Sequence, residues 1–160
     1  MSHRTERHCQ ESEDYEVGEK SRVLITGAAG LVGGILRSHW GDRHRLRLAD
    51  IRPIEMLAVH EEFAETDIAE YDQVLKACTG MDVVVHLAAD PSMEAQFYQT
   101  LLPLNVIGAY NAFEAAREAG CKRIVFASSI NAVLGYRDQT DVKWEVPVFP
   151  QNVYGATKCW

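Results

Sequence analysis

The chain has 160 residues, which is enough for one domain with a sizeable buried core. Its formal net charge of -7 argues against nucleic acid or an anionic membrane as a main partner. The longest apolar run, VVVHLAA, is far too short to span a bilayer, and the N-terminus has no apolar signal core. The four cysteines show no metal-ligand spacing: Cys9, Cys78, Cys121 and Cys159. We therefore expect a cytoplasmic protein with free thiols and no metal site.

The chain begins with a polar, charge-dense segment, residues 1–20, for which we expect a disordered tail. From residue 21 onward, short β-branched apolar runs alternate with segments of helical spacing. The expected strands are 22–26, 46–50, 62–68, 82–89 and 123–129, and the expected helices are 31–40, 54–60, 70–78 and 103–119. Strands that are apolar almost throughout are typical of a sheet covered on both faces. The order predicts a doubly wound parallel α/β sheet of the Rossmann type.

The last of these helices has an apolar stripe at helical intervals. We expect this stripe to face the core or a second subunit; it consists of Val106, Ile107, Tyr110, Phe113 and Ala116.

One histidine, His86, lies inside the expected fourth strand. We interpret it as a hydrogen-bonded core residue.

A glycine-rich turn follows the first strand and precedes the first helix. Gly27 allows a sharp turn off the strand, and Gly30 lets the backbone approach a pyrophosphate at the helix N-terminus. Gly33 removes a side chain so that helix and sheet can pack closely. Leu31 and Val32, between the last two glycines, are expected to border the same dinucleotide site.

An acidic residue, Asp50, ends the second strand, where a carboxylate can accept both ribose hydroxyls of an adenosine. It would also repel a 2′-phosphate, so the sequence favours NAD over NADP. Arg52 lies two residues later and weakens this preference, because a guanidinium can pair with a phosphate.

Tyr154 and Lys158 are four residues apart, a spacing that places two side chains on one helix face. An ammonium beside a phenol stabilises the phenolate. The Tyr154 oxygen could then accept a proton from a substrate hydroxyl while the carbon below gives a hydride to a nicotinamide. The pair is predicted to be catalytic.

Six motifs occur in the order found in one family: TGxxGxxG ending at residue 33, LADI (48–51), TDI (66–68), HLAA (86–89), FASS (126–129) and YxxxK (154–158). With them, the chain resembles the extended short-chain dehydrogenase/reductases, the NAD-dependent epimerase/dehydratase family. The segments HLAADPS, NVIGAYNAFEAAREAG and RIVFASSINAVLGY look most like its uronate (hexuronic acid) dehydrogenase branch. The resemblance implies that residues 21–160 form the N-terminal part of an NAD-binding Rossmann domain.

The resemblance also assigns site residues. Lys158 would hold the nicotinamide ribose, and a serine hydroxyl after the fifth strand would orient the substrate oxygen: Ser129, with Ser128 as the alternative. This loop differs by one residue from the commoner family spacing. Ser92 is a further candidate substrate contact. The remaining expected cofactor contacts are Asp67, Ile68, Leu87, Ala88, Ala89 and Asn105.

Three functions remain open on the sequence alone. The first is an NAD-dependent dehydrogenase that oxidises a sugar or sugar acid. The second is a nucleotide-sugar epimerase or dehydratase, in which the cofactor is reduced and reoxidised within one cycle. The third is a non-catalytic NAD-binding module. Family members usually continue well past YxxxK, so we expect that this chain is truncated after the motif and lacks the substrate region. A homodimer through the 103–119 helix is a further expectation.

Overall fold

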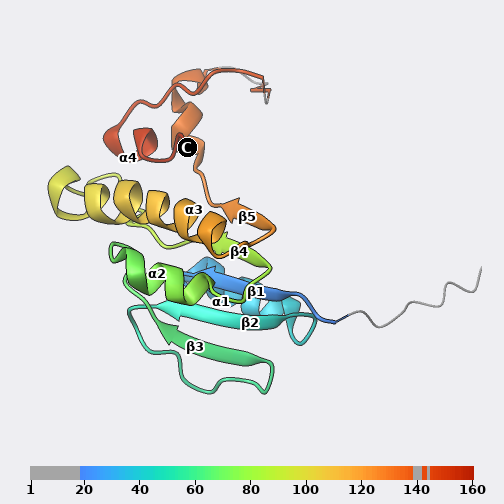
Figure 1. Ribbon diagram of the computed structural model, residues 1–160. Helices are drawn as coiled ribbons and strands as arrows, with labels where there is room; N and C mark the ends of the chain where they lie inside the picture. The colour runs from blue at the N-terminus through green and yellow to red at the C-terminus, as the bar shows by residue number, and fades with distance from the viewer. Residues whose placement is uncertain (1–18, 139–141, 144) are drawn as a thin grey trace, which may run out of the picture.

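The computed structural model describes residues 19–138, 142–143 and 145–160. Five strands form one parallel sheet in the order β3-β2-β1-β4-β5 (Figure 1). The strands are β1 (Arg22–Thr26), β2 (Arg45–Asp50), β3 (Glu61–Glu65), β4 (Val83–His86) and β5 (Arg123–Phe126). The predicted doubly wound parallel sheet is confirmed. The predicted tail falls outside the described residues, except for its last two positions.

Helices cover both faces of the sheet. Helix α1 (Leu31–Trp40) packs on one face through Leu36 and Trp40, against side chains of β1, β2 and β4. Helices α2 (Tyr71–Cys78) and α3 (Gly108–Glu118) lie side by side over the other face (Figure 1). The order in which strands are added to the sheet reverses at β1: β2 and β3 lie on one side of it, and β4 and β5 lie on the other. In such sheets ligands bind beyond the carboxyl ends of the strands at this point.

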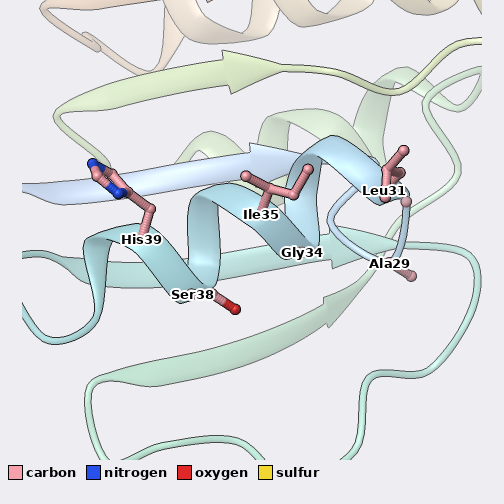
Figure 2. Close-up of a pocket in the computed structure, with 7 residues that line it drawn as sticks. Ala29, Leu31, Gly34, Ile35, Ser38 and His39 are labelled. Carbon is pink, nitrogen blue, oxygen red and sulfur yellow. The ribbon is translucent and has the colours of Figure 1, made fainter.

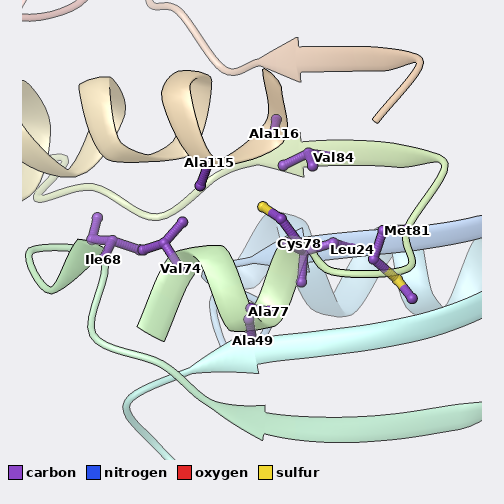
Figure 3. Close-up of a cluster of buried hydrophobic side chains, with 10 residues drawn as sticks. All are labelled: Leu24, Ala49, Ile68, Val74, Ala77, Cys78, Met81, Val84, Ala115 and Ala116. Carbon is purple, nitrogen blue, oxygen red and sulfur yellow. The ribbon is translucent and has the colours of Figure 1, made fainter. Parts of the chain in front are cut away.

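The larger core cluster lies between the sheet and the α2–α3 layer (Figure 3). On this side α3 contributes the small residues Ala115 and Ala116. Of the predicted stripe Ala116 is buried, whereas Ile107 and Tyr110 are 42% and 58% exposed and do not face the core; their packing against a second subunit stays a prediction. Small side chains allow α3 to approach α2 closely. The buried residues of α3 are Gly108, Ala109, Asn111, Ala112, Ala115 and Ala116.

The helix before β5 also begins earlier than predicted. It starts at Phe97 as η1 (Phe97–Ile107), which has the wider π-type hydrogen bonding, and continues directly into α3. Pro103 lies inside η1 and has no N–H to donate. In an α-helix its ring would press on the carbonyl of the preceding turn, so the wider helix relieves that contact. The helix was predicted to begin at Pro103, but this proline lies inside a longer helix and marks a distortion in it.

The segment after β2 was predicted to be a short helix over residues 54–60, and this was wrong. It is a loop in which Met56 has a positive φ of 51°. Arg37 on α1 donates to the Met56 carbonyl at 2.8 Å, and the Ala58 N–H donates to Glu61 at 2.8 Å. The Met56 carbonyl and the Ala58 N–H, which in a helix would form backbone hydrogen bonds, are thus hydrogen-bonded to side chains.

Three strands end earlier than predicted, each near the same edge of the sheet. β3 ends at Glu65, β4 at His86 and β5 at Phe126. The residues that follow, 66–68, 87–89 and 127–129, turn away from the ladder. These turns, with the glycine turn after β1, form the rim of the cavity described next.

Candidate active site

A cavity of about 600 Å³ opens at the carboxyl ends of the strands, over the β1–β4 point of reversal. Most of the residues predicted to touch a cofactor or substrate line it: Gly27, Gly30, Leu31, Val32, Gly33, Asp50, Asp67, Ile68, Leu87, Ala88, Ala89, Ser128, Tyr154 and Lys158. The sequence analysis assigned no role to five further lining residues, although four lie inside segments that it quoted and Leu104 directly precedes another. They are Ile51, Thr66, Pro91, Leu104 and Ala127.

The glycine turn has the tight geometry that its spacing predicts. Gly27 has a φ of +69°, and a Cβ there would lie 2.7 Å from the Ala88 backbone nitrogen. A Cβ on Gly33 would lie 2.7 Å from the Cα of Ala28. Within the described residues, no side chain caps the N-terminus of α1 at Gly30, and the first turn holds no acidic residue. The N–H groups of that turn therefore face the cavity and favour an anion.

Asp50 is held at the end of β2 by backbone donors. Its Oδ2 accepts from the Ala29 N–H at 3.0 Å, and its Oδ1 accepts from the Arg52 N–H at 3.0 Å. The Arg52 Nε lies 3.5 Å from Oδ1, and the Arg52 side chain is 64% exposed. Oδ1 thus accepts from both Arg52 groups, while Oδ2 keeps one lone pair for a ribose hydroxyl, and the carboxylate is fixed at the cavity wall.

The turn after β3 is held by a residue that the sequence analysis missed. Asn111, buried on α3, donates through Nδ2 to the carbonyls of Ile68 and Ala69 at 2.9 and 3.1 Å. Asp67 Oδ1 accepts from the Ala69 N–H at 2.9 Å. An amide on a buried helix face was the available signal, since such a group needs a partner.

Tyr154 and Lys158 are both buried, at 8% and 5% exposure, and both line the cavity. They do not share a helix as predicted, because α4 spans only Val153–Ala156 and Lys158 follows it. The Lys158 Nζ donates to the Ala127 carbonyl at 3.2 Å and lies 5.0 Å from the centre of the Phe126 ring. Burial lowers the pKa of Lys158 below its usual value.

A network of asparagines docks the Tyr154 helix on η2 (Ile130–Tyr136), a 3-10 helix. Asn152 caps α4 by accepting from the Gly155 N–H at 2.6 Å, and its Nδ2 donates to Asn131 Oδ1 at 2.9 Å. Gly155 packs so closely on Asn131 that a Cβ would collide with the Asn131 backbone. The sequence analysis missed this network, although Asn is a common helix cap.

The predicted serines occupy three different positions. Ser128 lines the cavity, and its Oγ donates to the Lys158 carbonyl at 2.7 Å. Ser129 instead caps η2, where its Oγ accepts from the Asn131 N–H at 3.2 Å. Ser92 lies in the loop after β4, outside the lining residues, and its Oγ accepts from the Glu94 N–H at 3.2 Å.

Asn105 lies behind the cavity wall, at 2% exposure on η1. It accepts from the Asp90 N–H at 2.8 Å, and its Nδ2 donates to the Asp90 carbonyl and to Thr157 Oγ1 at 3.0 and 3.1 Å. Its polar atoms thus bind the chain on both sides of the cavity.

His86 is 1% exposed at the end of β4, as expected for a hydrogen-bonded core residue. Its Nδ1 lies 2.7 Å from Thr26 Oγ1. Burial, together with the nearby Lys158 charge, lowers the pKa of His86 to about 4. The ring is therefore neutral at physiological pH.

A second, more open hollow lies along the outer side of α1 (Figure 2). Its volume is about 640 Å³, and Leu31, Ile35 and His39 follow one side of the helix there (Figure 2). Only Gly30 and Leu31 of the predicted site residues belong to it. The hollow is therefore separate from the sheet edge where the predicted residues meet.

Over residues 19–138, 142–143 and 145–160, no three His, Cys, Asp or Glu side chains are grouped so that they could hold a metal ion. In the same part of the chain, no helix combines the length and apolar character needed to cross a membrane.

Comparison with known proteins agrees with this geometry. Uronate dehydrogenase of Pseudomonas putida KT2440 is 38% identical over 142 residues, which are 88% of this chain and 52% of that protein. The structure is similar to glucuronic acid dehydrogenase from Chromohalobacter salexigens, with a TM-score of 0.81 and 40% identity over 87% of this chain and 52% of that one.

A mutant uronate dehydrogenase from Agrobacterium tumefaciens, complexed with NAD, has a TM-score of 0.77 and 36% identity over 88% of this chain and 52% of that one. The chain thus spans about half the length of the relatives it matches. The profile of the NAD dependent epimerase/dehydratase family matches residues 23–160. The chain belongs to this family.

Proposed function

We propose that this chain binds NAD and carries the proton acceptor of an NAD-dependent oxidoreductase that acts on a sugar or sugar acid. The observation that carries the proposal is one cavity that joins three features: the uncapped N-terminus of α1, the fixed carboxylate of Asp50, and the buried pair Tyr154 and Lys158. Each feature suits a different part of a dinucleotide.

The residues present fit the cofactor. The N–H groups at the start of α1 would bind the pyrophosphate, and the absence of a Cβ at Gly30 lets it approach the backbone. The Asp50 carboxylate, which keeps a free lone pair on Oδ2, would accept a hydroxyl of the adenosine ribose. The small residues Ala88 and Ala89 would let the dinucleotide pass close to the turn after β4.

NAD, when bound, supplies the acceptor for a hydride from the substrate carbon. Tyr154 would take the proton from the substrate hydroxyl. Lys158 would stabilise the resulting phenolate by its charge, and its buried position strengthens that interaction. Of the two serines considered for orienting the substrate oxygen, Ser128 is favoured because it lines the cavity, while Ser129 caps η2.

The relatives support a sugar-acid substrate, since their names include uronate and glucuronic acid dehydrogenases. Oxidation of a hexuronic acid would produce NADH in proportion to the substrate consumed. An epimerase or dehydratase of the same family would return the cofactor to its oxidised form in each cycle.

Two measurements test the proposal. Titration calorimetry of the 160-residue chain with NAD⁺ should show binding, and heat no larger than that of dilution would refute it. Absorbance of NADH should then rise with hexuronic acids for a version extended by the second half of a relative, and much less for this chain alone. Tyr154→Phe should abolish that rise without loss of NAD⁺ binding. Sugar conversion without net NADH would instead favour an epimerase.

The serine assignment has its own matched pair of variants. Ser128→Ala should lower the rate of NADH production, and Ser129→Ala should mainly lower the stability of η2. The reverse pattern would identify Ser129 as the substrate contact.

We also propose a homodimer and a cytoplasmic location. Exposed apolar side chains follow η1 and the start of α3, where Tyr98, Ile107 and Tyr110 are 83%, 42% and 58% exposed. Light scattering of the chain and of Tyr110→Glu would test the dimer. Free thiols at Cys78, Cys121 and Cys159 suit a reducing compartment.

A further inference from the structure

Thr26 and His86 face one another at the centre of the sheet, directly below the proposed cofactor site. They are partners in the β1–β4 register, and both are essentially fully buried. The Thr26 Oγ1 is 2.7 Å from His86 Nδ1. The same oxygen accepts from the N–H groups of Leu87 and Ala88, at 3.2 and 3.3 Å, and the Leu87 N–H is shared with the Thr26 carbonyl at 3.2 Å.

These contacts determine where the protons lie. A hydroxyl has one hydrogen to donate and two lone pairs to accept. Because the Leu87 and Ala88 N–H groups can only donate, they occupy the lone pairs of Oγ1. The hydroxyl hydrogen therefore goes to His86 Nδ1, which must be unprotonated. A neutral ring with its proton on Nε2 is the state that satisfies every contact.

The turn that Thr26 holds is the one most tightly packed against the glycine turn. A Cβ added to Gly27 would lie only 2.7 Å from the Ala88 backbone nitrogen. Leu87, Ala88 and Ala89 all line the cavity. A small movement of this turn would therefore narrow the cavity or open a gap at the dinucleotide.

We propose that Thr26 and neutral His86 act together as positioning residues for NAD: the imidazole Nδ1 holds the Thr26 hydroxyl, and the hydroxyl holds the turn Leu87–Ala89. Protonation turns His86 Nδ1 from a hydrogen-bond acceptor into a donor, whose new hydrogen would point at the hydrogen of the Thr26 hydroxyl. The hydroxyl must then turn, and it loses one or both of its N–H partners. The inference rests on the proposed binding of NAD.

The groups that face His86 oppose this protonation. On β5 the Phe126 ring is stacked on His86 with 5.9 Å between ring centres, and the Lys158 ammonium lies over the Phe126 ring, 5.0 Å from its centre. On β1 the facing group is the neutral Thr26. Burial and the Lys158 charge together lower the pKa of His86 to about 4. The loss of positioning is therefore expected only in acid.

The test is NAD⁺ titration calorimetry of the full 160-residue chain at neutral pH. Thr26→Val keeps the side-chain volume and His86→Phe keeps a planar ring; each removes one partner and should weaken binding by about tenfold, the cost of one hydrogen bond. Thr26→Ser and His86→Asn keep the hydroxyl and an acceptor near Nδ1, so both should bind within about threefold of wild type. The double variant Thr26→Val/His86→Phe should bind no more weakly than Thr26→Val alone.

A pH series separates positioning from simple loss of stability. Wild-type affinity should fall from pH 7 towards pH 4 more steeply than that of His86→Asn, which cannot titrate. Long-range proton–nitrogen NMR of the wild type should show His86 protonated on Nε2 at neutral pH. That spectrum needs no bound cofactor, and it remains informative if His86→Phe does not fold.

The outcomes are distinguishable. No binding of NAD⁺ by the wild type would refute the proposed function itself. Wild-type binding with equal affinity in Thr26→Val, an Nδ1-protonated spectrum, or identical pH curves for wild type and His86→Asn would each overturn the positioning role alone.

Discussion

Asn105 and Thr157, 52 residues apart in the chain, are joined by a buried hydrogen bond of 3.1 Å. Thr157 in turn donates to the Tyr154 carbonyl at 2.7 Å. Asn105 also pairs with both backbone groups of Asp90. The η1 helix thus fixes the segment that carries Tyr154 and Lys158 relative to the loop after β4.

Asn105→Ala should therefore destabilise the chain by about 2–3 kcal/mol, because it removes the partner of both part-buried backbone groups of Asp90 and one partner of the buried Thr157 hydroxyl. Urea unfolding measures this change. Gln99→Ala is the control, since Gln99 is exposed on the same helix, and it should change the stability by less than about 0.5 kcal/mol. Equal effects of the two substitutions would show that the Asn105 contacts contribute nothing.

Gly33 and Gly34 are neighbours on α1, and substitution by alanine should have opposite effects. A Cβ on Gly33 would lie 2.7 Å from the Ala28 backbone, whereas one on Gly34 would meet no described atom within 4 Å. Gly34→Ala should stabilise the chain by about 0.5–1 kcal/mol through helix propensity. Gly33→Ala should destabilise it by about 1–3 kcal/mol through overpacking.

Thermal or urea unfolding of the two single variants checks the sign of each change. Each variant serves as the control for the other, since they differ only in which face of α1 receives the methyl group. A stabilising Gly33→Ala would mean that α1 can move away from the sheet at no cost.

The sequence predicted the sheet and the cavity well because both depend on local patterns. Continuous apolar runs indicated the five strands, and the glycine spacing indicated the turn at Gly27. What it missed depends on contacts between distant segments. Asn111 holds the turn at Ile68 from 43 residues away, and Thr26 is bonded to a histidine 60 residues later. No local pattern encodes such pairs.

The errors in the helices have a similar cause. Tyr110 satisfies the spacing of a buried stripe, but α3 buries Gly108, Asn111 and its alanines instead, and Tyr110 is 58% exposed. The spacing of Tyr154 and Lys158 suggested one helix, yet α4 ends at Ala156 and the Lys158 position is set by the Ala127 carbonyl and the Phe126 ring. The spacing of apolar residues along a helix does not show how closely the neighbouring elements pack against it.

Asp50 and Arg52 should decide between NAD and NADP. Asp50→Ser removes the carboxylate that would repel a 2′-phosphate, and it frees the exposed Arg52 side chain from its 3.5 Å contact. The ratio of the NADP⁺ to NAD⁺ dissociation constants should fall by about tenfold or more. Calorimetry with both nucleotides measures it. Adding Arg52→Ala should reverse the gain for NADP⁺, and an unchanged ratio in Asp50→Ser would place specificity elsewhere.

The loop after β2 is held by a buried ion pair that should make stability depend on pH. Arg37 donates through Nε and Nη2 to the two carboxylate oxygens of Glu61, both at 2.7 Å, and the Glu61 side chain is only 3% exposed. The hydrogen bond from Arg37 holds the pKa of Glu61 below its usual value of 4.5. Stability contributed by a carboxylate with a lowered pKa is full above the unfolded value and is lost as the pH falls through the folded one.

The free energy of unfolding should therefore decrease as the pH falls below about 4.5, and Glu61→Gln should reduce that decrease because Gln does not titrate. Arg37→Met at neutral pH should cost about 2 kcal/mol, since it leaves a buried carboxylate without its partner. Arg117→Met is the matched control, because it breaks the Arg117–Glu114 pair, in which the arginine is 71% exposed. That pair should contribute less than about 0.5 kcal/mol. Equal losses in the two variants, or parallel acid curves for wild type and Glu61→Gln, would contradict the role of Glu61 in holding the loop.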